Sequence, residues 1–206
     1  MNENVTTKVK IGEVRFSYVH IFTPEAVAEG NEKKYSVSLI IPKTSTRLVA
    51  EIKRAIEAAV QAGIASRFEG RRPANLRTPL RDGDLERPDD DAYAGAWFIN
   101  VSSKTKPGIV KRMKINGENK LVEVTNEEDI YSGCYGFASV NFFAYNNKGN
   151  KGIGAGLNNI LKTRDGDYLG GRTSAESDFG NGAVDLDAYE DFEDLPESAS
   201  GRLKLV

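Results

Sequence analysis

GCYGFASVNFFAYN, residues 133–146, carries the clearest structural pattern in the chain. Its side chains alternate in character from one position to the next, as they do on a β-strand. The even positions carry small or apolar side chains: Cys134, Ala138, Val140, Phe142 and Ala144. The odd positions carry Tyr135, Phe137, Ser139, Asn141, Phe143 and Tyr145. We therefore expect a strand with one face in a barrel core and the other face mixing aromatic rings with hydrogen-bonding groups.

Other strands surround this one in the chain. The turn 147–150 leads into KGIGAGLNNILKT (151–163), which predicts a long β-hairpin whose glycines allow close backbone packing. Upstream, Val, Ile, Phe and Tyr predict strands at 8–22, with a bulge at Gly12, and at 34–42 and 96–104.

Residues 44–63 favour a helix, capped by Thr44, Ser45 or Thr46 and with Gly63 near its end. The Arg- and Pro-rich stretch 64–95 shows no sustained period and predicts a long, largely irregular excursion. Residues 111–124 favour a hairpin turning at Asn116-Gly117, and 127–131 favour a short helical turn.

Composition narrows the chemistry. Cys134 is the single cysteine and His20 the single histidine, which argues against a disulfide, a thiolate metal cage and histidine-based catalysis. The sequence contains neither a signal peptide nor about 18 consecutive apolar residues, so we expect a cytoplasmic protein without a membrane span. We expect no catalytic residues, no metal and no cofactor.

Charge is divided unevenly along the chain. Of 28 Lys and Arg and 30 Asp and Glu, residues 1–176 hold 26 and 22, whereas residues 177–206 hold 2 and 8. A basic body with an acidic end suggests a site for a polyanion and a separate acidic appendage.

Short strands with one helix among them indicate a mostly β, α+β chain. We predict an OB-fold, a five-stranded Greek-key β-barrel with one inserted helix, over residues 1–172. Residues 173–206 are expected to form a flexible acidic tail, disordered when alone.

The strand faces predict a surface for single-stranded DNA, because bases stack on exposed aromatic rings and phosphates attract Lys and Arg. The candidate DNA-binding residues are Arg15, Phe98, Asn100, Lys104, Lys106, Lys111, Arg112, Tyr135, Phe137, Asn141, Phe143, Tyr145, Lys148 and Lys151. Alternatively, Phe137 and Phe143 are core residues beneath a loop or in a homodimer.

An enzymatic alternative rests on Asp82, Asp84 and the run 89–91, which could hold Mg²⁺ in a nuclease. These residues fall in one stretch instead of on converging rigid elements, so a solvated loop is the preferred interpretation. A third alternative is a recombination or annealing mediator that acts mainly through protein contacts.

Several blocks together resemble the bacteriophage single-stranded-DNA-binding proteins of the OB-fold type. The blocks are RFSYVHIFTPEA (15–26), KYSVSLIIPK (34–43), PLRDGD (79–84), YAGAWFINVSSKTKP (93–107), YSGCYGFASVNFFAYNNKGNKGIGAGLNNILKTRDGDYLGGR (131–172) and SAESDF (174–179). The resemblance implies sequence-tolerant binding of DNA strands exposed in phage replication, recombination and repair. It favours the aromatic residues of 133–146 and the basic residues beside them as the DNA surface.

The resemblance also implies an acidic tail that recruits partner proteins. Related tails are often acidic close to an aromatic terminus, whereas this chain ends in SASGRLKLV (198–206). The expected partner-binding segment therefore moves inward, to Asp187, Tyr189, Glu190, Asp191, Phe192, Glu193 and Asp194. The same segment could also compete with DNA for the protein's own basic surface.

Overall fold

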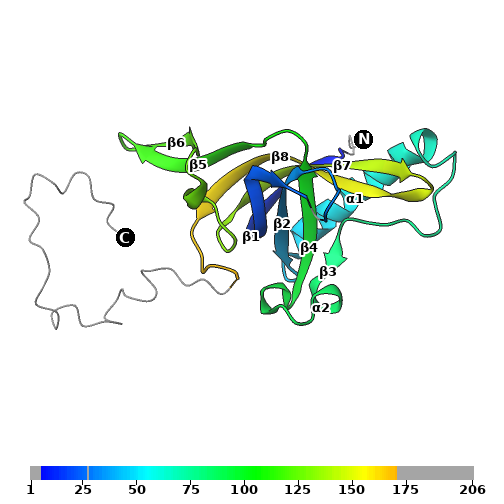
Figure 1. Cartoon of the computed structure of the whole chain (residues 1–206), viewed down its shortest axis with the longest axis horizontal. Helices are drawn as coiled ribbons and strands as arrows, with labels where there is room; N and C mark the ends of the chain where they lie inside the picture. The colour runs from blue at the N-terminus through cyan, green and yellow to red at the C-terminus, as the bar shows by residue number, and fades with distance from the viewer. Residues whose placement is uncertain (1–5, 27, 171–206) are drawn as a thin grey trace, which may run out of the picture. The chain divides into compact units, whose positions relative to one another are not determined.

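The computed structural model describes residues 6–26 and 28–170 (Figure 1). Its elements, in chain order, are β1 (Lys8–Glu25), β2 (Lys34–Pro42), α1 (Thr46–Ser66), β3 (Arg81–Asp82), α2 (Gly83–Glu86), η1 (Asp91–Tyr93), β4 (Ala96–Ser103), β5 (Gly108–Ile115), β6 (Glu118–Glu123), η2 (Glu127–Asp129), β7 (Tyr135–Asn147) and β8 (Asn150–Arg164). The predicted tail segment 187–194 lies outside the described residues.

Five of the strands close into a barrel. Hydrogen bonds join them in the order β4-β2-β1-β7-β8, and a parallel pairing of Ser102 with Gly156 joins β4 back to β8. Strands β4 and β8 are thus parallel, whereas the other neighbouring strands of the barrel are antiparallel. This confirms the prediction of a five-stranded OB-type barrel with one main helix.

The inner and outer faces of β7 are those that the alternation predicts. Ala138, Val140 and Phe142 are buried in the core, whereas Phe137 and Phe143 point outward and are 37% and 47% exposed. Because β7 lies between β1 and β8, its inner face meets side chains from most of the barrel.

The first strand bends at the predicted bulge. The register between β1 and β7 shifts between Ile11 and Val14. A Cβ at Gly12 would lie 2.6 Å from the Phe137 ring, so only glycine lets the two strands approach this closely. A second register shift, between Ser17 and His20, interrupts the pairing of β1 with β2.

Helix α1 packs on β7 and β1, and its buried face carries Ile52, Ala55, Ile56, Ala59 and Val60. These are residues of the predicted apolar stripe. The N-cap is Ser45, although its side chain makes no capping hydrogen bond, and the helix runs three residues past Gly63 to Ser66.

The stretch 64–95 is more ordered than the irregular excursion that we predicted. Phe68 is fully buried, and the Arg77 carbonyl accepts a hydrogen bond from the Ile153 amide at 2.9 Å. The stretch also contains β3, α2 and η1. Tertiary contacts of this kind have no periodic signature in a sequence.

The predicted hairpin at 111–124 is confirmed as β5 and β6, which turn at Asn116-Gly117 with φ of 52° and 83°. Only Gly108–Lys111 pair with β8, so the rest of the hairpin extends from the barrel as a two-stranded ribbon (Figure 1). Within the described ranges, none of the helices is long and apolar enough to cross a membrane.

Candidate nucleic-acid interface

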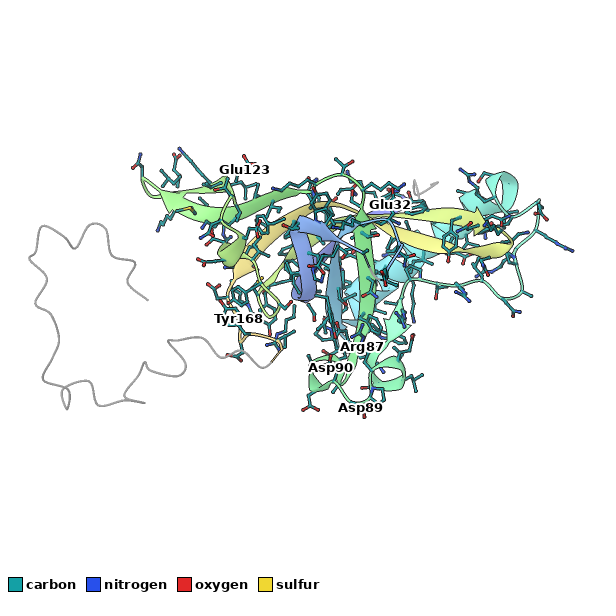
Figure 2. All side chains as sticks on the ribbon, viewed as in Figure 1. Glu32, Arg87, Asp89, Asp90, Glu123 and Tyr168 are labelled. Carbon is teal, nitrogen blue, oxygen red and sulfur yellow. The ribbon has the colours of Figure 1, made fainter. Side chains whose placement is uncertain are left out.

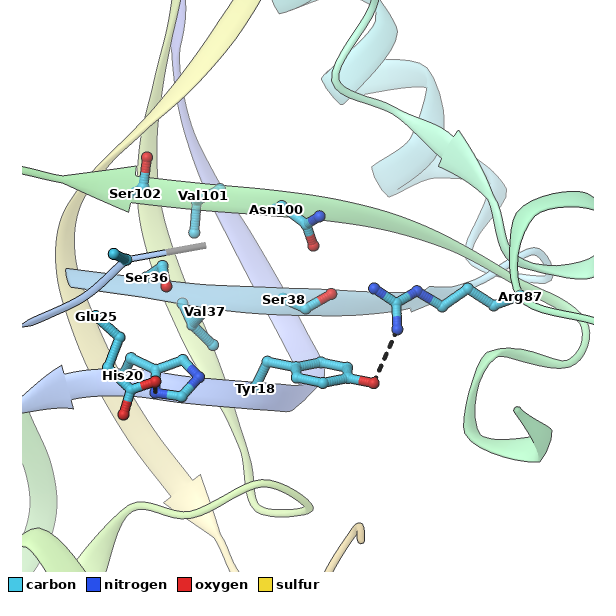
Figure 3. Close-up of a pocket in the computed structure, with 11 residues that line it drawn as sticks. Tyr18, His20, Glu25, Ser36, Val37, Ser38, Arg87, Asn100, Val101 and Ser102 are labelled. Atoms are coloured by element: carbon cyan, nitrogen blue, oxygen red, sulfur yellow. Dashed lines mark hydrogen bonds and ion pairs between the residues drawn. The ribbon is translucent and has the colours of Figure 1, made fainter. Parts of the chain in front are cut away.

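A hollow of about 470 Å³ lies on the outer face of β1, β2 and β4 (Figure 3). The inward side chains Val37, Leu39 and Ile41 leave the intervening serines of β2 facing out. Register then sets Ser38 opposite Asn100 and Ser36 opposite Ser102. The strands therefore supply a row of small groups that can either donate or accept hydrogen bonds.

Tyr18 forms one wall of this hollow. The backbone at Tyr18 is left-handed, with φ of 47°, within the irregular stretch of β1 between Ser17 and His20. Its ring is 51% exposed, and its hydroxyl accepts a hydrogen bond of 3.0 Å from Arg87 Nη1 (Figure 3). A strained backbone that holds an aromatic ring at the surface is a common feature of ligand sites.

Arg87 is held by three aromatic rings. Its guanidinium carbon lies 4.7 Å from the ring centroid of Tyr93, 4.8 Å from that of Tyr18 and 5.4 Å from that of Phe98. Within residues 6–26 and 28–170 it makes no ion pair. Cation–π contacts thus fix this charge and leave it available to an anion.

The rings beneath Arg87 correct one sequence prediction. Phe98, expected on the DNA-facing side of 96–104, is fully buried and packs edge-on against Tyr93 with centroids 5.1 Å apart. The Tyr93 hydroxyl bonds to Ser38 Oγ at 3.0 Å. Phe98 supports the arginine from below and offers no open face to a base, because η1 brings Tyr93 over it.

A second aromatic–arginine group lies further along β1. The guanidinium carbon of Arg164 lies 3.4 Å from the Tyr135 ring centroid, and that of Arg15 lies 5.8 Å from it. Tyr135 and Arg15 line a second hollow of about 210 Å³. The Thr163 hydroxyl and then Arg164 lower the pKa of Glu13, which keeps this carboxylate charged beside them.

Arg15 also fixes the segment that follows β8. It donates to the Gly133 carbonyl at 3.3 Å and to the Asp167 carbonyl at 2.7 Å. Leu169 packs beside the Phe98 cluster. The segment after β8, which contains Asp167 and Leu169, therefore lies next to both hollows.

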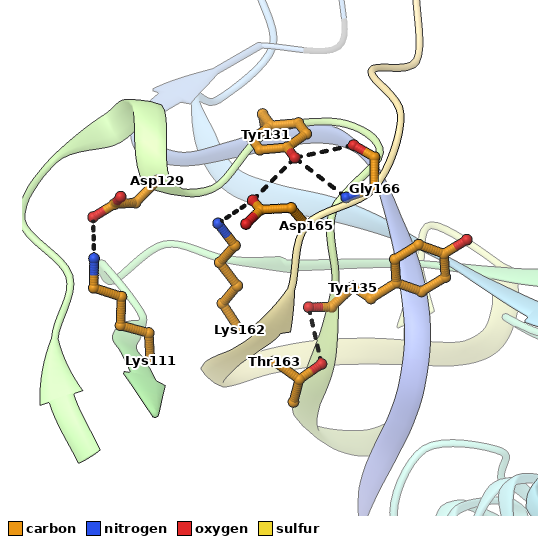
Figure 4. A network of polar contacts seen from close by, with 8 residues as sticks. All are labelled: Lys111, Asp129, Tyr131, Tyr135, Lys162, Thr163, Asp165 and Gly166. Atoms are coloured by element: carbon orange, nitrogen blue, oxygen red, sulfur yellow. Dashed lines mark hydrogen bonds and ion pairs between the residues drawn. The ribbon is translucent and has the colours of Figure 1, made fainter. Parts of the chain in front are cut away.

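A polar network secures this segment from its other side (Figure 4). The Tyr131 hydroxyl bonds to Asp165 and Gly166, its ring stacks on Tyr168 at 4.0 Å, and Lys162 pairs with Asp165 at 2.6 Å. Burial raises the pKa of Tyr131 to about 12, so the hydroxyl stays protonated. We assign this network a structural role.

Of the other predicted residues, three lie at or near the first hollow. Asn100 lines it, and Lys104 and Lys106 follow shortly after Ser102. Lys104 pairs with Glu32 at 2.7 Å, and the Lys106 ammonium lies 5.5 Å from the Phe22 ring centroid.

The remaining predicted residues lie elsewhere. Lys111 is paired with Asp129 at 2.8 Å, and Arg112 is exposed on the ribbon. Lys148 and Lys151 lie at the β7–β8 turn, where Lys151 pairs with Glu69 at 3.1 Å. Phe137, Asn141, Phe143 and Tyr145 lie on the outer face of β7. The single predicted surface is thus divided among several places.

Sequence reasoning missed Tyr18 and Arg87. Figure 2 shows Arg87 with Asp89 and Asp90 near α2, and Glu123 away on the ribbon. Tyr18 could have been noticed, because RFSYVH breaks the alternation of the first strand. Arg87 had no such signal, since it lies in the stretch without a period.

Three of the carboxylates of the nuclease hypothesis, Asp82, Asp84 and Asp90, are engaged structurally. Lys43 pairs with Asp82 at 2.6 Å and with Asp84 at 2.7 Å, and it lowers the pKa of Asp84. Asp90 caps η1 by accepting from the Ala92 amide. In the described part of the chain, His, Cys, Asp and Glu form no group suited to a metal ion.

The chain is similar to known phage proteins. The family model described as "Enterobacter phage Enc34, ssDNA-binding protein" matches residues 7–192. "Putative protein p50" of Acyrthosiphon pisum secondary endosymbiont phage 1 is 32% identical over 178 residues, which cover 84% of this chain and 92% of that protein.

Solved structures are similar as well. The single-stranded DNA-binding protein from bacteriophage Enc34, in complex with ssDNA, is 29% identical with a TM-score of 0.68, over 80% of this chain and 90% of that one. Gp2.5, a single-stranded DNA binding protein of bacteriophage T7, is 16% identical with a TM-score of 0.51, over the same shares of the two chains. The T7 likeness is evidence for the fold alone.

Proposed function

The chain belongs to the phage Enc34-type family of single-stranded-DNA-binding proteins, and on this premise we propose how and where it binds a DNA strand. The family is non-catalytic, so binding itself is the activity to explain. We place the strand along β1, from the hollow at Tyr18 to the hollow at Tyr135.

One observation carries the proposal: two aromatic rings, exposed Tyr18 of β1 and half-buried Tyr135 of β7, each have an arginine beside them. Arg87 holds Tyr18, and Arg164 lies 3.4 Å from the Tyr135 centroid. A ring with a cation over one face suits a nucleotide, whose base can stack on the ring surface that the cation leaves uncovered while its phosphate approaches the charge. The first hollow also lies on the second and third barrel strands, where OB-folds commonly bind oligonucleotides.

Polar contacts in the groove suit binding without sequence preference. Serine hydroxyls can donate or accept, so the partly exposed Ser36 and Ser102 can satisfy the edge of any base, whereas Ser38 is buried and bonded to Tyr93. Stacking is also tolerant, because every base has a π-face. Lys104 and Lys106 extend the cationic track beyond the hollow.

In the infected cell, we propose that the protein coats and protects single strands during phage DNA replication, recombination and repair. We further propose that residues 1–172 bind DNA, while 173–206 form the acidic tail that recruits partner proteins through Asp187–Leu195. A peptide of that composition, acidic with interspersed aromatic residues, suits a basic and partly apolar groove on a partner.

The test is a fluorescence anisotropy titration of labelled oligo-dT at several salt concentrations. Each phosphate contact to a single strand contributes about −0.7 to the slope of log K against log[salt], so four contacts give about −2.8. Arg87→Gln should weaken binding and make the slope less steep by about 0.7. Arg54→Gln, on the exposed side of α1 and without an ion pair in the described ranges, is the matched control.

Absent or salt-independent binding by the wild-type protein would overturn the proposed function. Binding that Arg87→Gln leaves unchanged in both affinity and slope would instead overturn the groove as the site.

A further inference from the structure

The outer face of β7 carries a second aromatic surface, beyond the groove. Phe137 and Phe143 are exposed here, and each ring lies directly on a glycine. A Cβ at Gly12 would come within 2.6 Å of Phe137, and one at Gly154 within 2.6 Å of Phe143. Glycine beneath each ring lets it lie against the sheet with its other face turned to solvent. The face is therefore a flat platform instead of a set of protruding side chains.

Two lysines without an ion pair in the described ranges border this platform. Lys8 pairs in register with Asn141, and Lys10 with Ser139, so both lysines flank β7 on its outer side. Both are exposed, and neither makes an ion pair within the described ranges. The carboxylate beside Gly12, Glu13, is already engaged by Thr163 and Arg164.

Asn141 is oriented by a local hydrogen bond. The Thr7 hydroxyl donates to Asn141 Oδ1 at 3.1 Å. The carbonyl oxygen of this amide is thereby occupied, and its two N–H groups are left to donate. Together with the lysines, they make the platform a donor-rich, cationic surface, which complements phosphate and base acceptors and disfavours basic or purely apolar partners.

The platform is continuous with the groove. Tyr135, in the second hollow, precedes Phe137 by two residues and lies on the same side of β7. A third hollow, of about 440 Å³, lies between Lys10 and Gly12 and the start of α1 at 44–48, on the same side of the molecule's first strand. A strand that leaves Tyr135 thus meets further rings and cations. Of the carboxylates beside this path, Glu13 is engaged by Thr163 and Arg164, and Glu51 lines the third hollow together with Arg47.

We propose that the DNA path continues from Tyr135 along the outer face of β7 to Phe143, with bases on Phe137 and Phe143 and phosphates at Lys8 and Lys10. This extension rests on the proposed function and predicts two classes of ligand. Oligonucleotides that fill only the groove ignore the platform, whereas longer ones need it.

The experiment compares dT oligonucleotides of about 4–6 and about 12–16 nucleotides, which span the site sizes of single OB-folds. Phe143→Ala should weaken binding of the long oligonucleotide by roughly fivefold to a hundredfold, the range for loss of one stacked base. The double variant Lys8→Glu with Lys10→Glu should weaken it too, with a salt slope less steep by about 1.4. Neither variant should change binding of the short oligonucleotide, which also serves as the test of folding.

Arg54→Glu on α1 is the control for charge reversal and should leave both lengths unaffected. Equal binding of the long oligonucleotide by wild type and both platform variants would overturn the extension while leaving the groove intact. A change in the protein's native mass in Phe143→Ala without a change in DNA affinity would overturn it as well, and would assign the platform to a second copy of the chain. If wild-type protein binds neither length, the proposed function itself fails.

Discussion

Replacing Tyr18 tests the groove most directly, because the ring is exposed and its surroundings are fixed. Alanine substitution of a stacking residue costs about 1–3 kcal/mol per base. Half of the Tyr18 ring already contacts protein, so we take the lower part of this range, about 1–2 kcal/mol. Tyr18→Ala should therefore bind oligo-dT roughly 5- to 30-fold more weakly. Its salt slope should not change, because the substitution removes no charge.

Two further variants distinguish the contribution of the Tyr18 ring from those of its hydroxyl and of its left-handed backbone. Tyr18→Phe removes only the hydrogen bond from Arg87, which is exposed and worth about 0.5–1.5 kcal/mol, so affinity should stay much closer to wild type. Tyr18→Gly removes the ring but relieves the left-handed backbone. It should match Tyr18→Ala in DNA affinity and exceed it in stability by about 1 kcal/mol.

Anisotropy titrations at a fixed salt concentration and urea unfolding of the free proteins provide both measurements. The stacking argument would be refuted by a folded Tyr18→Ala protein that binds as wild type does. It would also be refuted if Tyr18→Phe lost as much affinity as Tyr18→Ala, since the hydroxyl would then be the important group.

The remaining predictions concern the end of the barrel domain and the tail. Gly133→Ala places a Cβ 2.0 Å from the Asp167 carbonyl at a φ of 122°, so it should destabilise the protein by a few kcal/mol and lower its melting temperature. Lys162 lowers the pKa of Asp165, so this carboxylate contributes stability above its unfolded pKa of about 3.9, and the contribution is lost as the pH falls through the folded pKa. Asp165→Asn should therefore flatten the acid limb of a curve of unfolding free energy against pH. An unchanged acid limb would contradict this prediction. Removal of 180–206 should retain or tighten DNA binding, most clearly at low salt, and abolish capture of partner proteins; weaker DNA binding would exclude competition by the tail.

The barrel and its buried faces are predictable from local sequence patterns. The alternation in 133–146 named the buried face of β7, and the apolar stripe of 48–60 named the buried face of α1. Asn116-Gly117 set the turn of the β5–β6 hairpin. These features depend on periodicity and turn chemistry, which are local and can be read from neighbouring residues.

The grouping of the proposed binding residues depends on contacts between segments that are distant in the chain. Phe98 and Asn100 share one side of β4, yet Phe98 is buried because Tyr93, from a stretch without a period, packs over it. Arg87 reaches Tyr18 across 69 positions of the chain. A strand pattern states which side a residue faces, but whether that side is open depends on what distant segments place on it. This is why the aromatic strand was predicted and the groove beside it was not.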